Sequence, residues 1–156
     1  MPRASQLFVT LLTTAALVLT LSLPADAVTL VGNGKANTLK GKGGNDKVQG
    51  GDGKDDVVGG DGNDRLDGGT GNDLLDDGPG NDRLSGDEGD DIFYVGPGKD
   101  TVFGEPGKNI VYLLNDGVRD EVYCGENDND RDDVLILVGG RDPADYVNFC
   151  GTVRTQ

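Results

Sequence analysis

The chain has 156 residues, of which 28 are acidic, 14 are basic and 27 are glycine, and its formal net charge at pH 7 is −14. A charge of this sign is repelled by nucleic acid and by anionic membranes, so we expect neither as a partner. The absence of histidine excludes histidine-based nucleophilic triads, and the Gly-Lys-Ser/Thr sequence of a phosphate-binding loop does not occur. Composition alone, rich in glycine and aspartate and poor in aromatic residues, would indicate disorder.

Residues 1–27 are predicted to be a signal peptide. Arg3 gives a short basic start, Leu7 to Leu23 is an apolar run, and Ala25-Asp26-Ala27 is a small-residue cleavage site. The alternative is a membrane anchor, but the run is shorter than the roughly 20 residues that a span needs. No later segment is apolar enough to span a bilayer. We therefore expect cleavage after Ala27 and a secreted, extracellular chain.

Gly32 to Tyr112 consists of nine consecutive units of nine residues, without a slip in register. With Gly32 as position 1, position 8 is apolar in every unit, at Leu39, Val48, Val57, Leu66, Leu75, Leu84, Phe93, Val102 and Val111. Position 6 carries aspartate in the interior units and asparagine in the two terminal ones, at Asn37, Asp46, Asp55, Asp64, Asp73, Asp82, Asp91, Asp100 and Asn109. A disordered linker has no reason to keep such a period, so the pattern predicts a folded solenoid.

Each unit has the features of half a coil. Glycine at positions 1, 2 and 4 permits a turn with positive φ, and position 8 lies at the centre of a three-residue strand. Two units then make one coil, position 8 points inward, and successive coils stack as parallel strands about 4.8 Å apart. Stacking places the position-6 residues in two columns, one along each edge of the solenoid.

The two columns of carboxylates predict sites for a hard cation. Neighbouring carboxylates repel each other, so an empty column opposes the stacking of the coils. Calcium reverses this effect, because it accepts about six to eight oxygen ligands in adaptable geometry, including the carbonyls that glycine-rich turns bring close. Magnesium fits less well, since it requires octahedral geometry and retains its waters. Because the apolar core is thin, we expect the chain to be largely unfolded without calcium and folded with it.

The units Gly59–Asp67 and Gly68–Asp76 follow the pattern G-G-x-G-x-D-x-U-x throughout, where U is apolar. In this pattern the sequence resembles the RTX, or haemolysin-type, calcium-binding nonapeptide repeat family. The resemblance implies an all-β fold, a right-handed parallel β-roll (β-solenoid) in which position-6 aspartates and carbonyls of stacked turns share each ion. The implied Ca²⁺ ligands are Asp46, Asp55, Asp64, Asp73, Asp82, Asp91 and Asp100. They make five strong sites, and Asn37 and Asn109 would add two weaker ones.

Several units depart from this pattern. Asp77 replaces glycine at position 1, and Asp87 and Glu105 replace it at position 2, so we expect the C-terminal half of the array to bind calcium more weakly. Tyr94 and Tyr112 lie at position 9, one coil apart, and are expected to stack on an outer face. This stack is either a platform for a sugar or another partner, or a surface covered by the C-terminal segment, and we favour the second interpretation.

After the β-roll of residues 28–112, residues 113–156 are predicted to be a degenerate capping segment. Shortened repeats remain at Asp120–Val122, Asp132–Val134 and Asp145–Val147. The apolar run Val134–Val138 is predicted to be the strand that closes the end of the core. Cys124 and Cys150 in an exported chain favour one disulfide, the alternative being free thiols or a metal-binding pair.

The acidic segment Glu126–Asp133 resembles an EF-hand loop only superficially. Counted from Asp128, the sixth position is Asp133 instead of glycine, and the twelfth is Gly139 instead of glutamate. A helix-loop-helix hand is therefore not predicted, although a supplementary calcium site remains an alternative.

Together these features predict extracellular calcium binding by a non-enzymatic module with no catalytic residues. One alternative is a calcium-dependent adhesion or carbohydrate-binding module at the cell surface, with a glycan or matrix component as its partner. The least favoured alternative is an enzyme that acts on polysaccharide through a pair of carboxylates.

Overall fold

The computed structural model describes residues 26–125, 132–140, 142–148 and 150–156, and the regular secondary structure in these ranges is entirely β. The predicted signal peptide, except its last two residues, and most of the EF-hand-like segment lie outside these ranges. In the part of the chain that is described, no helix is long and apolar enough to cross a membrane.

The strands are short and follow one another at regular intervals. They are β1 (Thr29–Val31), β2 (Thr38–Lys40), β3 (Lys47–Asp52), β4 (Asp56–Val58), β5 (Arg65–Thr70), β6 (Leu74–Asp76), β7 (Arg83–Glu88), β8 (Ile92–Val95), β9 (Thr101–Phe103), β10 (Ile110–Leu114), β11 (Glu121–Tyr123), β12 (Val134–Val138), β13 (Tyr146–Asn148) and β14 (Thr152–Thr155).

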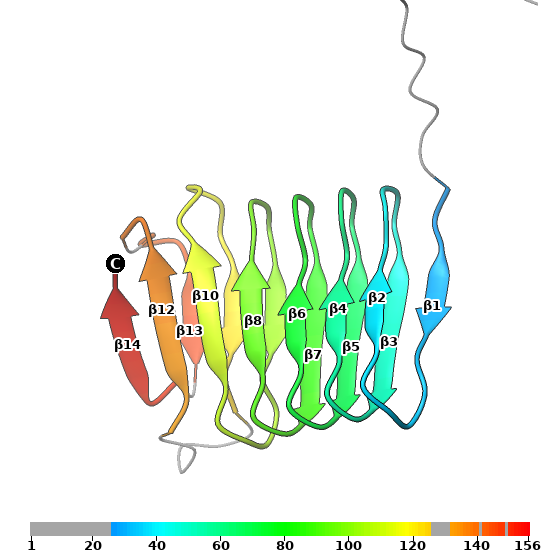
Figure 1. Ribbon diagram of the computed structural model, residues 1–156. Coiled ribbons are helices and arrows are strands. Elements are labelled where there is room, and N and C mark those ends of the chain that lie inside the picture. The colour runs from blue at the N-terminus through cyan, green and yellow to red at the C-terminus, as the bar shows by residue number, and fades with distance from the viewer. Residues whose placement is uncertain (1–25, 126–131, 141, 149) are drawn as a thin grey trace, which may run out of the picture.

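These strands form two parallel sheets of seven strands each. One sheet has the order β1-β3-β5-β7-β9-β11-β13, and the other has the order β14-β12-β10-β8-β6-β4-β2. Successive strands therefore alternate between the sheets, and each coil contributes one strand to each sheet (Figure 1). The expected all-β solenoid is confirmed.

In the regular part of the array, neighbouring strands pair at the offset of one predicted coil. Val48 pairs with Leu66 in one sheet, and Val57 pairs with Leu75 in the other. The array also begins one strand before Gly32, because Leu30 of β1 pairs with Val48. Leu30 lies nine residues before Leu39, so it extends the position-8 pattern.

The position-8 side chains form one inward-facing row in each sheet, and the two rows face each other. The buried members are Val48, Val57, Leu66, Leu75, Leu84, Phe93, Val102 and Val111, whereas Leu39 is partly buried. Val122 and Leu135 continue these rows beyond the strict repeats, and Val95, Leu113 and Leu137 add a second buried position in β8, β10 and β12. Each buried aliphatic side chain stabilises the fold by about 1.5–3 kcal/mol. A core that is only two facing rows of side chains over most of its length leaves the turns at its edges with a large influence on stability.

The C-terminal segment extends both sheets through coils of unequal length. The inward-facing pairs there are Val102 with Val122, Val111 with Leu135, and Val122 with Val147. The shortened repeats at Asp120 and Asp145 are therefore in the predicted register. The repeat expected at Asp132–Val134 is wrong by one residue, because Asn109 contacts Asp133 and Val111 pairs with Leu135.

The strand at the C-terminal edge of the sheet that contains Val134–Val138 is β14, which corrects the expectation that this apolar run closes the core. This apolar run is β12, and it pairs with β10 on one side and β14 on the other. Thr152–Thr155 of β14 is exposed along its length and is largely polar. A polar edge strand discourages pairing with other chains, which an apolar one would promote.

Cys124 and Cys150 form the predicted disulfide, with their Cα atoms 5.0 Å apart. It joins the residue after β11 to the segment between β13 and β14. The disulfide therefore connects the last coils of the solenoid to one another.

The expected stack of Tyr94 and Tyr112 is present, with ring centroids 5.0 Å apart and planes at 8°. The favoured interpretation that the C-terminal segment covers it is wrong for Tyr94, which remains 43% exposed. The reason is that β11–β14 extend the two sheets and do not fold back over their outer faces.

Candidate metal centre

The turns at both edges depend on glycines that lie against the neighbouring coil. Gly60 and Gly62 have φ values of 115° and 138°, in the region that other residues rarely adopt. A Cβ atom on Gly62 would overlap the carbonyl oxygen of Gly44 in the preceding coil. Glycine therefore allows the turns to stack closely and keeps side chains away from their carbonyl oxygens.

The position-6 residues form two hydrogen-bonded ladders, one along each edge. In each step a backbone N–H donates to Oδ1 of the position-6 residue in the next coil, as from Asp46 to Asp64 at 2.7 Å. The first ladder contains Asp46, Asp64, Asp82, Asp100, Asp120 and Asp145. The second contains Asn37, Asp55, Asp73, Asp91, Asn109 and Asp133. All of the residues predicted as calcium ligands lie in these two ladders.

The structure adds Asp120, Asp133 and Asp145, which sequence reasoning did not include among the site residues. They follow the previous ladder member by 20, 24 and 25 residues, so they escape a search at a constant period. For Asp120 and Asp145 a signal was present, because each is followed at the second position by an inward-facing valine.

The second carboxylate oxygen, Oδ2, is buried at most of the aspartates in the two ladders. It has no hydrogen-bond partner among the described residues at Asp55, Asp64, Asp73, Asp82, Asp91, Asp100 and Asp120. Buried carboxylate oxygens without partners are costly, so they indicate a ligand.

In the regular turns, Oδ2 lies beside the space that a position-1 glycine leaves open. A Cβ atom on Gly68 would be 2.7 Å from Asp73 Oδ2 and 2.9 Å from the carbonyl oxygen of Gly86. At Gly59 the corresponding distances to Asp64 Oδ2 and the Asp77 carbonyl oxygen are 2.5 and 2.6 Å. A carboxylate oxygen and a carbonyl oxygen from the next coil thus converge on a space without side chains, as a hard cation requires.

Asn109 shows what lies in this space when position 6 is an amide. Its Oδ1 accepts a hydrogen bond from the Asp91 N–H, as an aspartate would. Its Nδ2 donates to the carbonyl oxygens of Glu105 and Cys124, at 3.0 and 3.2 Å. The amide nitrogen of Asn37 likewise donates to the carbonyl oxygen of Lys35. An asparagine turn therefore closes with its own hydrogen bonds, whereas an aspartate turn places a negative oxygen against the carbonyls and needs a cation.

Several carboxyl groups in the middle of the ladders are difficult to ionise in the absence of metal. The pKa is raised to about 6 at Asp82 and to about 7 at Asp91 and Asp100. Burial is the largest cause, the hydrogen bond from the preceding coil opposes it, and the charges of neighbouring carboxylates add to it. A bound cation would counter both the burial and the repulsion.

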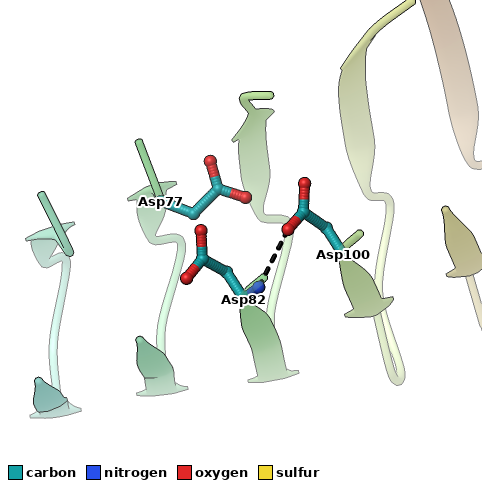
Figure 2. A group of neighbouring side chains, drawn as sticks. All are labelled: Asp77, Asp82 and Asp100. Carbon is teal, nitrogen blue, oxygen red and sulfur yellow. Dashed lines mark hydrogen bonds between the residues drawn. The ribbon is translucent and has the colours of Figure 1, made fainter. Parts of the chain in front are cut away.

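One group of three carboxylates stands out within the described ranges. The ligand atoms of Asp77, Asp82 and Asp100 lie within 4.8 Å of one another, and all three side chains are buried. Figure 2 shows them directed toward a common space, with the Asp82 N–H bonded to Asp100 Oδ1 at 2.8 Å. Asp77 Oδ1 accepts a hydrogen bond from the Gly96 N–H at 2.8 Å, and burial raises the pKa of Asp77 to about 8.

The donor set of both ladders fits calcium. Every candidate ligand is a carboxylate, amide or carbonyl oxygen, and the two cysteines are joined in a disulfide. Oxygen donors suit hard cations, whereas zinc and copper prefer the nitrogen and sulfur ligands that these turns lack. When bound, calcium would supply positive charge between stacked turns, while the chain supplies the oxygens and holds the turns in register.

Comparisons with known proteins agree with this geometry. The RTX calcium-binding nonapeptide repeat family matches in four overlapping copies, at residues 31–66, 58–93, 67–102 and 85–115. A search of curated proteins and a search of solved structures each found no match. The matched copies cover more than half of the chain and contain most of both ladders. The chain therefore belongs to the RTX calcium-binding nonapeptide repeat family.

Proposed function

We propose that this protein is a secreted, non-enzymatic calcium-binding module that folds when it binds calcium. The observation that carries the proposal is the set of buried Oδ2 atoms that have no hydrogen-bond partner among the described residues and lie beside carbonyl oxygens along both edges. The membership in a calcium-binding repeat family supports the choice of ion.

The dependence of folding on calcium follows from the balance between core and turns. The core is thin, with one inward-facing row from each sheet over most of its length, and the ladders beside it hold aspartates that are almost fully buried, such as Asp55 and Asp73. Without a cation, ionised carboxylates in these positions lose their hydration and repel the next coil. With a cation between them, the same carboxylates bind each coil to the next.

The test is a calcium titration of residues 28–156, which is monitored by calorimetry and, on the same samples, by circular dichroism. We expect uptake of about five to seven ions together with a coil-to-β transition. Magnesium at the same concentrations should give little of this transition, because it retains its waters. The same β signal in chelator and in about 1 mM calcium would reject calcium-dependent folding, and no uptake would reject calcium binding.

Secretion is supported by the apolar segment at Leu7–Leu23 and by the disulfide. Disulfides persist in oxidising compartments and are rare in the cytosol. Expression in a host with a secretory pathway should release a protein that begins at Val28, as measured by intact mass. Retention inside the cell at the full-length mass would contradict this part of the proposal.

The non-enzymatic role is supported by the assignment of the buried aspartates to the turns, where they accept backbone hydrogen bonds. The chain also lacks histidine. Cleavage of polysaccharides by the pure calcium-loaded protein would contradict it.

A second candidate function, binding of glycans, is favoured by the tyrosine stack on the outer face. Tyr94 and Tyr112 lie beside a shallow pocket that also includes Asp76 and Leu114. Exposed aromatic rings beside polar groups suit sugar recognition, because the rings cover the apolar faces of sugars. A glycan array probed with the calcium-loaded protein and with a Tyr94→Ala, Tyr112→Ala variant tests it. Signals that do not change in the variant would reject this surface as a glycan site.

A further inference from the structure

Among the position-1 residues of the repeats, all of which the structure describes, Asp77 alone replaces glycine with a carboxylate that lies beside a ladder. In the regular turns of the same edge, Gly41 and Gly59 leave this position open beside the Oδ2 atoms of Asp46 and Asp64. The Asp77 side chain instead approaches Asp82 of its own unit and Asp100 of the next coil, to within 4.8 Å between ligand atoms (Figure 2).

The environment of Asp77 does not explain its presence as a structural residue. The side chain is completely buried, and Gly96 N–H is the donor to Oδ1, while Oδ2 has no hydrogen-bond partner among the described residues. No lysine or arginine of the described chain forms an ion pair with Asp77, Asp82 or Asp100. The Oδ2 atoms of Asp82 and Asp100 are also without hydrogen-bond partners there. Three buried carboxylates together are strongly unfavourable unless a cation lies between them.

Asp77 is also not needed for the backbone conformation of its turn. Its φ is not positive, unlike those of Gly78 and Gly80 that follow it. Glycine would be accepted at this position, as it is at Gly41 and Gly59 in the equivalent turns. The carboxylate is thus an addition to a turn that closes without it.

We propose that Asp77, Asp82 and Asp100 form a calcium site with three carboxylates, which binds calcium more tightly than the sites with two carboxylates and fills first. The inference rests on the proposed calcium-binding function and ranks the sites within it. Calcium affinity rises with the number of charged ligands, and this site has one more carboxylate than the others. It reverses, for this turn, the expectation that departures from the repeat weaken binding.

The test measures calcium affinities by competition with a chelating dye, for the mature chain and for the variants Asp77→Asn and Asp77→Gly. Asparagine keeps the size and the acceptor for the Gly96 N–H, whereas glycine restores the repeat pattern. We expect one site in the unmodified protein with a dissociation constant at least about tenfold lower than the others. Both variants should lose this tight site and still fold at higher calcium concentration.

The matched control is Asp87→Gly. Asp87 also replaces a repeat glycine with an acid, but at position 2 of the next unit and outside the three-carboxylate cluster. The Asp87→Gly substitution removes the same charge, but outside the cluster, so the tight site should be unchanged in this variant. If the tight site persists in both Asp77 variants, or is lost equally in Asp87→Gly, the proposal is overturned.

The outcomes also separate this inference from the proposed function. If the unmodified protein binds no calcium, both fail. If it binds calcium at sites of equal affinity that do not depend on Asp77, only the three-carboxylate site fails.

Discussion

Replacing Asp73 by asparagine should remove two calcium sites at once. Asp73 lies in the middle of the second ladder, where its Oδ1 accepts from Asp55 N–H at 2.7 Å and its own N–H donates to Asp91 Oδ1 at 2.8 Å. Asparagine can preserve both hydrogen bonds, because Asn109 makes the equivalent ones. The substitution therefore changes the charge and the ligand atom while it keeps the ladder.

The magnitude follows from the pairing of the aspartates. Asp73 forms one candidate site with Asp55 and another with Asp91. With a dissociation constant of about 0.1 mM and about 1 mM free calcium, each site stabilises the folded state by roughly 1.4 kcal/mol. The loss of two sites should lower the free energy of unfolding by about 3 kcal/mol in calcium. At low calcium the loss should shrink, because the new amide donates to carbonyls and a buried charge is removed.

The assay is urea unfolding at several calcium concentrations, with circular dichroism as the readout. The slope of the free energy of unfolding against the natural logarithm of calcium concentration, divided by RT, counts the ions released on unfolding, and this number should fall by about two in the variant. Asp56→Asn is the matched control, because this exposed side chain in β4 carries the same charge outside the ladder. It should change stability by less than about 0.5 kcal/mol. A loss in Asp73→Asn that is equal at all calcium concentrations would refute the reasoning.

Three further predictions follow from the same geometry. In metal-free protein the raised pKa values of Asp77, about 8, and Asp82, about 6, mean that the folded state binds more protons than the unfolded one, so the protonation contribution to stability is complete below about pH 4 and is lost progressively as the pH rises from about 4 to 8. The β signal in chelator should accordingly increase on acidification, and circular dichroism that is constant over this range would contradict it. Leu75→Ala, at a fully buried core position, should destabilise the calcium-loaded protein by about 2–5 kcal/mol in urea unfolding, and a loss below about 1 kcal/mol would mean that the row is loosely packed. Replacing both Cys124 and Cys150 by serine should lower stability by about 2–4 kcal/mol without changing the number of ions bound, whereas a lower ion count would show that the disulfide also shapes the sites.

The nine-residue period was sufficient to predict the regular coils. Position 8 became the buried rows, and position 6 became the two ladders, because each unit combines its own turn glycines, strand and inward residue within nine residues. The coil then repeats by stacking, so a local pattern specifies the long-range contacts. The predicted ligands such as Asp64 and Asp73 therefore lie where the repeat pattern placed them.

The C-terminal coils could be predicted only in part, because their lengths vary. Asp133 occupies the ladder position that the sequence pattern assigned to Asp132, and Leu135 occupies the core position assigned to Val134. Adjacent acidic residues leave the register ambiguous by one residue. Pairing with Asn109 and Val111 of the previous coil resolves it, and that is a tertiary contact.

The sequence by itself determined the repeat, the inward-facing residues, the acidic edges and the class of ion that suits them. Only the tertiary structure decided which carboxylates meet, since proximity across coils depends on side-chain direction as well as on spacing. Asp77 illustrates the difference: in the sequence it is a lost glycine, whereas in the structure it lies beside Asp82 and Asp100. The physical reason is that the nine-residue period sets the position of each residue along the backbone, whereas the side chains that meet between two turns come from two different coils.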